Sequence, residues 1–334
     1  MIPKTFLKNQ LLRTLTLLPF SILRRLSGQT SFFPYYHLVS EFVPEYIGNS
    51  YPVATPQEFE KELDLLLKYY CPVDLSTLIL TVKNNLPFPK SSFHLTFDDG
   101  YREVYDVVFP ILRRKGIPAT FFICSDLLDN RNIFWENLYS LMQKTWDELA
   151  DPGKEEIMKS EPGNALALSE SLAYRNKERY LAIAKALGFS PASFLQEEQP
   201  YLTSPQIREM MASGFTIGSH SIDHPLFKDL ILSEQLRQIE ESCRVMAETF
   251  QLDYRVFAFP YGEFGVGKAL FETLQERGTI DLLFGTRGII PDEYPWVIQR
   301  FGMEQAHVWK AIRTELAMKW IRRRVNNDLV TRRQ

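Results

Sequence analysis

The stretch FHLTFDDG, residues 93–100, decides the fold of this chain. It runs from apolar, strand-forming residues directly into two aspartates and a glycine, which predicts a strand at 93–97 with the aspartates just after its end. A helical pattern of apolar residues follows, Gly116 closes it, and the apolar run 119–124 predicts a second strand. A strand, a crossover helix and a second strand form a βαβ unit, which predicts a parallel sheet covered by helices.

The alternation of strands and helices continues outward from this unit. A capping box at Thr55 with proline at the first helical position predicts a helix that reaches about Tyr70. Between about residues 131 and 200 the pattern is helical and more polar, and we interpret it as an insertion. The remaining strands are expected at 215–218, 255–259, 282–286 and 296–301, and a final helix at about 308–324.

Length and composition are those of a folded protein. The chain has 334 residues, 45% of them hydrophobic and 24% charged, which excludes disorder as the main state. Three widely spaced cysteines do not form the framework of a disulfide-stabilised secreted protein. We expect them to be free thiols.

Positive charge gathers at both ends of the chain. Residues 1–40 carry five basic residues and no acid, and residues 319–334 have six basic residues against one aspartate, although the whole chain has a net charge of −3. An anionic membrane surface would attract such ends, and solvated tails are the alternative. The apolar run 15–23 contains Pro19, precedes two arginines and is too short to cross a bilayer, so we expect a surface-lying or core-packed helix.

Two clusters of polar residues follow predicted strands. Asp98 and Asp99 are adjacent carboxylates, which require a cation or hydrogen-bond donors beside an apolar strand. The alternative is a turn in which one aspartate caps the next helix.

The second cluster contains His220 and His224, two of the five histidines of the chain. Imidazoles four residues apart in a helical turn point the same way and can bind one metal ion. A structural histidine pair is the alternative. Two histidines and one aspartate form a metal site with one position open for water, and the second aspartate would then accept a proton from that water.

A third element is the turn Pro260-Tyr261-Gly262, whose backbone N–H groups could face a developing oxyanion. In this order the three motifs resemble those of the polysaccharide deacetylase family, carbohydrate esterase family 4. The resemblance covers roughly residues 33–301. It implies an α/β fold with a distorted (β/α) barrel at residues 33–305, which contains the insertion at about 131–200. A basic, partly apolar segment, 1–32, precedes the barrel. A helix and basic tail, 306–334, follow it.

The resemblance also implies roles for single residues. Asp98 would be the general base, the backbone N–H of Tyr261 would bind the oxyanion, and the metal ligands would be Asp99, His220 and His224. The implied reaction is hydrolysis of N-acetyl groups on an amino-sugar polymer or sugar conjugate.

This sequence departs from the family pattern in its other catalytic groups. Ala258 occupies the position where many members have an arginine that pairs with the catalytic acid. Arg300 resembles the arginine of members that lack the earlier one, and we hypothesise that it orients Asp98. The general acid is unassigned among His37, His307 and His94, and the place of His94 within a strand favours a packing role.

Two other functions stay open at this point. The basic N-terminal segment would suit a deformylase or deacetylase of a lipid-linked sugar, and the missing motifs would suit a non-catalytic carbohydrate-binding relative. Zn²⁺ fits the donor set, as do Co²⁺, Ni²⁺ and Fe²⁺. We expect an acetylated glycan as partner, no nucleic acid, membrane-surface contact through the basic termini, and a cytoplasmic or membrane-surface location. An extracytoplasmic location and the oligomeric state stay open.

Overall fold

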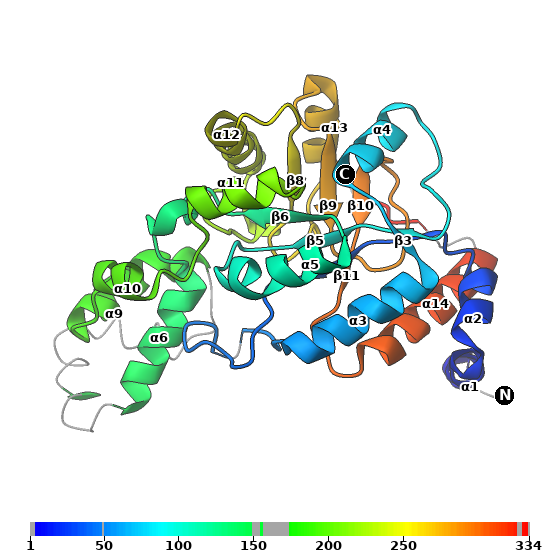
Figure 1. The fold of residues 1–334 in the computed structure, drawn as a ribbon, viewed down its shortest axis with the longest axis horizontal. Coiled ribbons are helices and arrows are strands. Elements are labelled where there is room, and N and C mark those ends of the chain that lie inside the picture. The colour runs from blue at the N-terminus through cyan, green and yellow to red at the C-terminus, as the bar shows by residue number, and fades with distance from the viewer. Residues whose placement is uncertain (1–3, 49, 149–153, 156–173, 326–328, 333–334) are drawn as a thin grey trace.

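The computed structural model describes residues 4–48, 50–148, 154–155, 174–325 and 329–332 (Figure 1). Its centre is an eight-stranded parallel sheet that curls into a nearly closed barrel, and helices surround it. Neighbours in the sheet follow the order β10 (Val297–Gln299), β9 (Leu282–Gly285), β8 (Val256–Ala258), β7 (Thr216–Ser219), β6 (Ala119–Ile123), β5 (Leu95–Phe97), β2 (Pro34–Tyr36) and β11 (Phe301–Gly302). The predicted (β/α) barrel is therefore confirmed.

One short stretch joins the two ends of this sheet. β10 and β11 are consecutive in the chain, with only Arg300 between them, yet β10 pairs with β9 and β11 pairs with β2. The backbone N–H of Arg300 donates to the carbonyl of Gly285 (3.0 Å), and the next N–H, of Phe301, donates to the carbonyl of Phe33 (2.9 Å). The strand thus changes partner at Arg300 and closes the barrel there.

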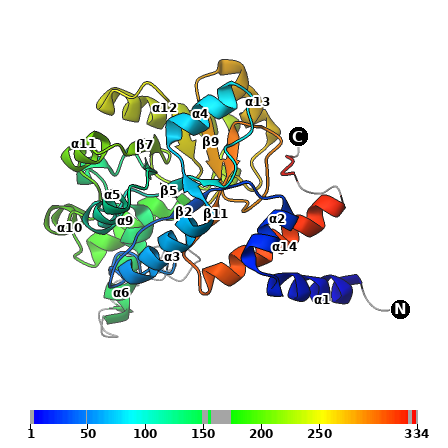
Figure 2. The same ribbon diagram turned by 45° about the vertical axis from the view of Figure 1, so that its right-hand side comes forward.

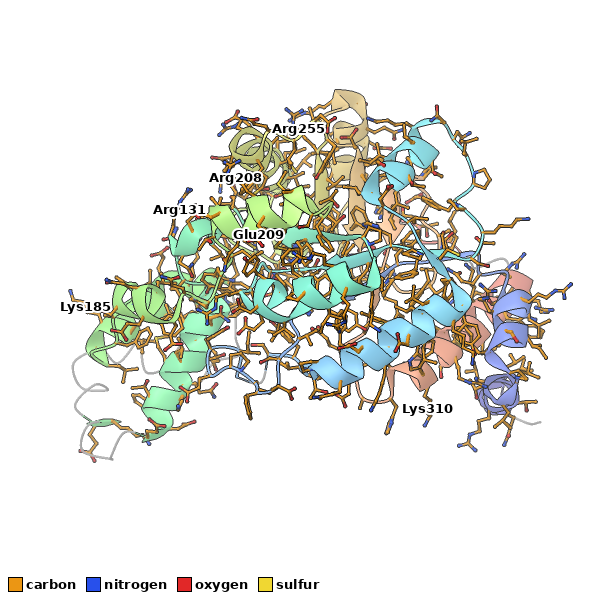
Figure 3. The ribbon with its side chains drawn as sticks, viewed as in Figure 1. Arg131, Lys185, Arg208, Glu209, Arg255 and Lys310 are labelled. Carbon is orange, nitrogen blue, oxygen red and sulfur yellow. The ribbon has the colours of Figure 1, made fainter. Side chains whose placement is uncertain are left out.

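The helices around the barrel follow the predicted alternation. They are α3 (Pro56–Tyr69), α4 (Leu75–Lys83), α5 (Phe109–Lys115), α11 (Ser204–Ala212), α12 (Leu232–Phe250) and α13 (Lys268–Arg277), and the π-helix η1 (Val104–Val108) precedes α5. α3 begins at the predicted capping box, in which Thr55 accepts from the backbone N–H of Glu58 and Glu58 accepts from that of Thr55. Charged side chains such as Arg208 and Glu209 of α11 lie on the outer surface (Figure 3). A second parallel sheet contains the short strands β1 (Ser31–Phe32), β4 (Ser92–Phe93) and β3 (Cys71–Pro72).

The described helices of the segment 131–200 lie at one end of the molecule (Figure 1). Its described helices are α6 (Trp135–Glu148), α9 (Lys177–Ala186) and α10 (Pro191–Glu198), with short 3₁₀ turns η2 (Leu128–Asn130) and η3 (Tyr174–Asn176) before them. Apolar side chains of α6 and α9 pack together with Tyr101 and Cys124 of the barrel. The segment 131–200 therefore shares a core with the strand ends of β5 and β6, and its description as an insertion stays a prediction.

The N-terminal helices and the C-terminal helix meet at the opposite end of the molecule. α2 (Phe20–Ser27) lies along the C-terminal helix α14 (Val308–Arg324), and α1 (Lys4–Leu17) also contacts α14 (Figure 2). Phe20 and Leu23 of α2 are buried in the main core. Within the described ranges, no helix has the length and apolar character needed to cross a membrane. The cysteines are free thiols, as expected, and Cys71 is exposed.

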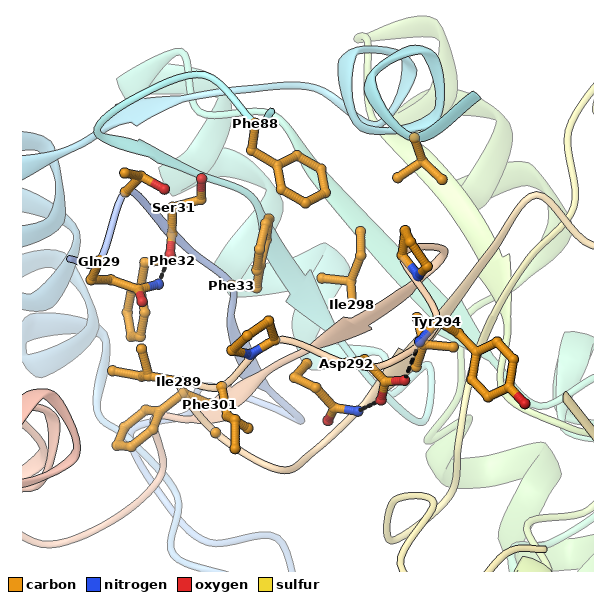
Figure 4. A pocket seen from close by; sticks show the side chains of 18 of the residues that line it. Gln29, Ser31, Phe32, Phe33, Phe88, Ile289, Asp292, Tyr294, Ile298 and Phe301 are labelled. Carbon is orange, nitrogen blue, oxygen red and sulfur yellow. Dashed lines mark hydrogen bonds between the residues drawn. The ribbon is translucent and has the colours of Figure 1, made fainter. Parts of the chain in front are cut away.

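A cavity of about 330 Å³ lies where residues 31–33 enter the barrel and β10 begins (Figure 4). Aromatic and aliphatic side chains, including Phe33, Phe88 and Ile298, line most of it. None of the residues singled out for catalysis or metal binding borders this cavity. The chemistry of the molecule lies instead at the carboxyl ends of the strands.

Candidate metal centre and active site

The strand ends place the two aspartates. β5 ends at Phe97, and the backbone N–H of Asp98 donates to the carbonyl of Tyr36 in the neighbouring strand β2 (2.9 Å). Asp99 and Gly100 both have positive φ, 72° and 80°, so the chain turns sharply at once. This turn directs the two carboxylates toward different neighbouring side chains. Asp98 and Asp99 are both only 2% exposed.

Asp99 meets the histidines that follow β7. Its Oδ1 lies 3.4 Å from Nε2 of His220 and 3.3 Å from Nε2 of His224. In the described part of the chain, these three side chains form a cluster that could hold a metal ion. Their ligand atoms all lie within 4.8 Å of one another. The histidines do not lie on a helical turn, as the spacing argument had assumed. Irregular backbone with positive φ at Ser221 and His224 brings both rings to one point instead.

The donor set fits a divalent ion. Oδ1 of Asp99 is buried and has no hydrogen-bond partner among the described residues, although it faces two imidazole nitrogens. Nδ1 of His220 lies 2.9 Å from the carbonyl of Ala258, which favours a proton on Nδ1 and leaves Nε2 free to bind metal. Burial alone would raise the pKa of Asp99, but the imidazoles of His220 and His224 hold it well below its usual value.

Asp98 forms a bidentate ion pair with Arg300. The two terminal guanidinium nitrogens lie 2.6 and 2.7 Å from Oδ1 and Oδ2 of Asp98, and one of them also donates to Oγ1 of Thr96 (2.9 Å). Arg300 is fully buried, against the rings of Tyr35, Phe122 and Phe284. Burial would raise the pKa of Asp98, but the charge and hydrogen bonds of Arg300 hold it below its usual value, so the carboxyl is ionised at neutral pH.

Tyr261 follows β8 and faces the same centre. Its backbone has φ 56°, and the backbone N–H donates no hydrogen bond to another described residue. Its ring packs edge-on against His224, with ring centres 4.7 Å apart. Tyr261 therefore lies beside the cluster of Asp99, His220 and His224. The resemblance implies such a position for a residue whose backbone N–H binds the oxyanion.

The three candidate acids lie in different surroundings. His94 is fully buried, and its two ring nitrogens contact the carbonyl of Val73 and Oγ1 of Thr120, each at 2.8 Å. Burial lowers its pKa to about 4, which supports a packing role. His307 is exposed at the start of α14. His37 directly follows β2, beside Asp98, and its Nδ1 contacts the carboxylate of Glu304.

Glu304 changes the charge state of His37. Burial alone would lower the pKa of His37, but the Glu304 carboxylate raises it to about 10, with smaller contributions from Asp99 and Asp98. His37 is therefore protonated at neutral pH. A cavity of about 470 Å³ borders this pair and is lined by Tyr35, His37, Tyr51 and Glu304 among others.

Sequence reasoning missed two carboxylates of this site. Glu304 lies just past the closing strand, and Glu136 lies in the first turn of α6, only 7% exposed. The hydroxyl of Tyr261 donates to Oε1 of Glu136. One sequence feature could have indicated that Glu136 is buried. It lies in a helical run between apolar residues, with Phe134-Trp135 before it and Leu138 after it.

Side chains of the segment 131–200 also contact the loop that carries the second histidine, His224. The indole N–H of Trp135 donates to the carbonyl of His224 (3.2 Å), and Nζ of Lys177 lies 2.5 Å from Oδ2 of Asp223, the residue before His224. Tyr174 donates to the same oxygen (2.8 Å). Helices α6 and α9 therefore fix the backbone that carries the second histidine.

The family model for polysaccharide deacetylases matches residues 85–158 and 171–276. This chain belongs to the polysaccharide deacetylase family. The match includes both aspartates, both histidines and the Pro-Tyr-Gly turn, and it confirms the predicted membership of a family of carbohydrate deacetylases.

Three relatives illustrate the similarity. Over 100 residues the chain is 31% identical to a poly-beta-1,6-N-acetyl-D-glucosamine N-deacetylase of Staphylococcus epidermidis, which is 30% of this chain and about a third (34%) of that protein. The fold is similar to that of the deacetylase PplD of Streptococcus pyogenes, with a TM-score of 0.54, 15% identity and coverage of 85% and 97% of the two chains. IcaB from Ammonifex degensii has the same TM-score of 0.54, 19% identity and coverage of 86% and 97%.

Arg300 provides a test of the site's architecture. Arg300→Met should lower the free energy of unfolding by about 3–5 kcal/mol at pH 7, because it leaves the Asp98 carboxylate buried without its partner. Asp98 is more acidic when folded than when unfolded, so the ion pair stabilises the fold above the normal aspartate pKa and loses this effect as pH falls. Urea unfolding at pH 7 and pH 3 measures both effects.

Arg300→Lys is the matched control, since it keeps the charge and loses the bidentate geometry, and it should cost less than Arg300→Met. Equal stability of Arg300→Met and the wild type at pH 7 would contradict the importance of this pair.

Proposed function

We propose that this chain removes N-acetyl groups from a polymer of N-acetylglucosamine by hydrolysis. The observation that carries the proposal is the arrangement of Asp98 and Asp99, in which one carboxylate pairs with Arg300 and the other faces two histidine Nε2 atoms. The activity named for the staphylococcal relative supports a β-1,6-linked N-acetylglucosamine polymer as substrate.

Asp99, His220 and His224 would hold a divalent ion, and Zn²⁺ suits this donor set, with Co²⁺, Ni²⁺ and Fe²⁺ as alternatives. Such an ion, when bound, would polarise the amide carbonyl and lower the pKa of water. Asp98 accepts the proton of the attacking water, because Arg300 keeps it ionised and in one orientation. The backbone N–H of Tyr261 donates to the oxygen that becomes negative as the tetrahedral carbon forms.

His37 serves as the general acid in this proposal. It directly follows β2, the strand that pairs with β5, so it lies at the same end of the barrel as Asp98. The Glu304 carboxylate keeps it protonated, and the proton passes from the imidazolium to the amine nitrogen as the C–N bond breaks. The products are acetate and a free amino sugar.

Two substitutions separate the roles of base and metal ligand. Asp98→Asn should keep the bound metal and lose at least about a hundredfold in turnover, because general-base catalysis contributes this much. His220→Ala should lose the metal itself. Elemental analysis of the purified proteins and an acetate-release assay on acetylated oligosaccharides provide the two readouts.

Retained turnover in Asp98→Asn would exclude Asp98 as the base. A wild-type protein that binds the metal and the oligosaccharide but releases no acetate would favour the non-catalytic alternative.

The pH dependence tests the acid. kcat/KM should fall as pH rises through about 10, where His37 loses its proton. In Glu304→Gln this alkaline limb should move to lower pH, because the charge that raises the pKa of His37 is gone. Full pH–rate profiles of both proteins with the metal restored measure the shift, and an alkaline limb that stays in place would rule out His37 as the acid.

The exposed side chains of α1 and α2 favour a second candidate function, in which the substrate is a sugar linked to a lipid. Leu17 is 83% exposed and Ile22 is 47% exposed, and the basic Arg13 and Arg25 are exposed on the same helices. Apolar and basic side chains together suit the interface of an anionic bilayer. In this second proposal the protein works at a membrane surface.

Substitution tests this contact better than deletion, since α2 buries Phe20 and Leu23 in the core. The double variant Leu17→Ser with Ile22→Ser should reduce co-sedimentation with phosphatidylglycerol vesicles severalfold. Each Å² of apolar surface that is no longer buried in the bilayer costs about 25 cal/mol of binding free energy. Leu80→Ser, at a 58% exposed position on α4, is the matched control. Unchanged sedimentation of the double variant would remove this candidate.

A further inference from the structure

The cavity of about 330 Å³ beside residues 31–33 and β10 has no part in the mechanism above (Figure 4). Its volume falls within the range of small-molecule sites, about 300–1,000 Å³. The side chains of Phe33, Phe88 and Ile298 give it an apolar wall, and the rings of Phe33 and Phe88 pack edge-on with centres 5.3 Å apart. This lining suits a ligand with an apolar body.

One polar atom in this wall has no partner. Ser31 is only 5% exposed, and its Oγ forms no hydrogen bond with another described residue. The carbonyl of the same residue, by contrast, accepts from Nε2 of Gln29. A buried hydroxyl that lacks a partner is costly for the folded protein. Oγ of Ser31 is therefore available to a polar group of a ligand in the cavity.

Lys319 and Asp292 are the charged residues that line the cavity in the described chain, and they differ in their surroundings. Figure 4 shows Gln29 and Ser31 on one side of the cavity and Asp292 on the other. Lys319 belongs to the side of Ser31, because its Nζ donates to Oε1 of Gln29. Asp292 is neutralised by a bidentate ion pair with Arg332. These charges favour an anionic group beside Ser31.

We propose that this cavity binds a medium-chain fatty acid. The carboxylate accepts hydrogen bonds from Oγ of Ser31 and Nζ of Lys319, and the alkyl chain packs among Phe33, Phe88 and Ile298. An ammonium group has three donors, so Lys319 can bind the carboxylate and keep its bond to the neighbouring amide. This site is separate from the deacetylase site, and the inference does not depend on the proposed function.

The cavity adjoins the residue that closes the barrel. Ile298 and Phe301 line it from either side of Arg300 in the sequence, and the N–H of Gly288, which also lines it, donates to the carbonyl of Arg300 (2.9 Å). A ligand that binds only the folded chain stabilises it. Occupancy of the cavity should therefore raise the midpoint temperature of unfolding.

The test titrates the purified full chain with decanoate, hexanoate and decyltrimethylammonium, each below its micelle concentration. Isothermal titration calorimetry should show one decanoate per chain, and decanoate should raise the midpoint of thermal unfolding. Each methylene added between hexanoate and decanoate should tighten Kd about fourfold, as expected for burial of an alkyl chain. The cation has an equally long chain but cannot accept these hydrogen bonds, so it should bind at least about tenfold more weakly.

Three variants locate the site. Ser31→Ala should weaken decanoate binding about 10- to 100-fold, as expected for a lost hydrogen bond to a charged group. Its free energy of unfolding should not fall, since the hydroxyl has no partner to lose among the described residues. Lys319→Met should weaken decanoate binding and remove the preference for the anion. Lys310→Met, at an exposed position on the same helix α14, is the matched control and should bind as the wild type does.

Unchanged decanoate affinity in Ser31→Ala would overturn the inference, and so would equal affinities of the wild type for decanoate and the cation. A wild type that neither binds decanoate nor unfolds at a higher temperature with it would overturn it as well. None of these measurements uses a glycan or a metal ion. Their outcome is thus independent of whether the protein releases acetate from any substrate.

Discussion

The ion pair between Arg300 and Asp98 links the closure of the barrel to the chemistry of the site. Arg300 is the residue at which the last strand changes partner from β9 to β2, so its backbone closes the sheet while its side chain points inward. A fully buried guanidinium requires a carboxylate partner with good geometry, and Asp98 provides it at the end of β5. The fold therefore cannot close in this form without also orienting the proposed base.

The segment 131–200 is part of this site. Trp135 and Lys177 hold the backbone around His224, and Glu136 lies against Tyr261. The loop with the second histidine has positive φ at two residues and no helical hydrogen bonds, so it depends on such contacts for its shape. Changes in the insertion would thus alter the metal centre and the substrate site together.

Much of this arrangement was predictable from local patterns. Parallel strands joined by crossover helices have their carboxyl ends at one end of the barrel, so Asp98, Asp99, His220 and Tyr261 had to lie there. The pairing of Arg300 with Asp98 spans 202 residues and came only from resemblance to a family. Glu136 and Glu304 were missed because a carboxylate in a helix or loop is usually exposed, and only tertiary packing shows that these two are buried.

The charges of the described site fit a bound cation. Arg300 neutralises Asp98, and the protonated His37 neutralises Glu304, since each pair is in direct contact. Asp99 remains, a buried carboxylate whose Oδ1 faces two histidine Nε2 atoms. A buried carboxylate between two neutral imidazoles is costly, and a cation held by the three side chains would remove that cost.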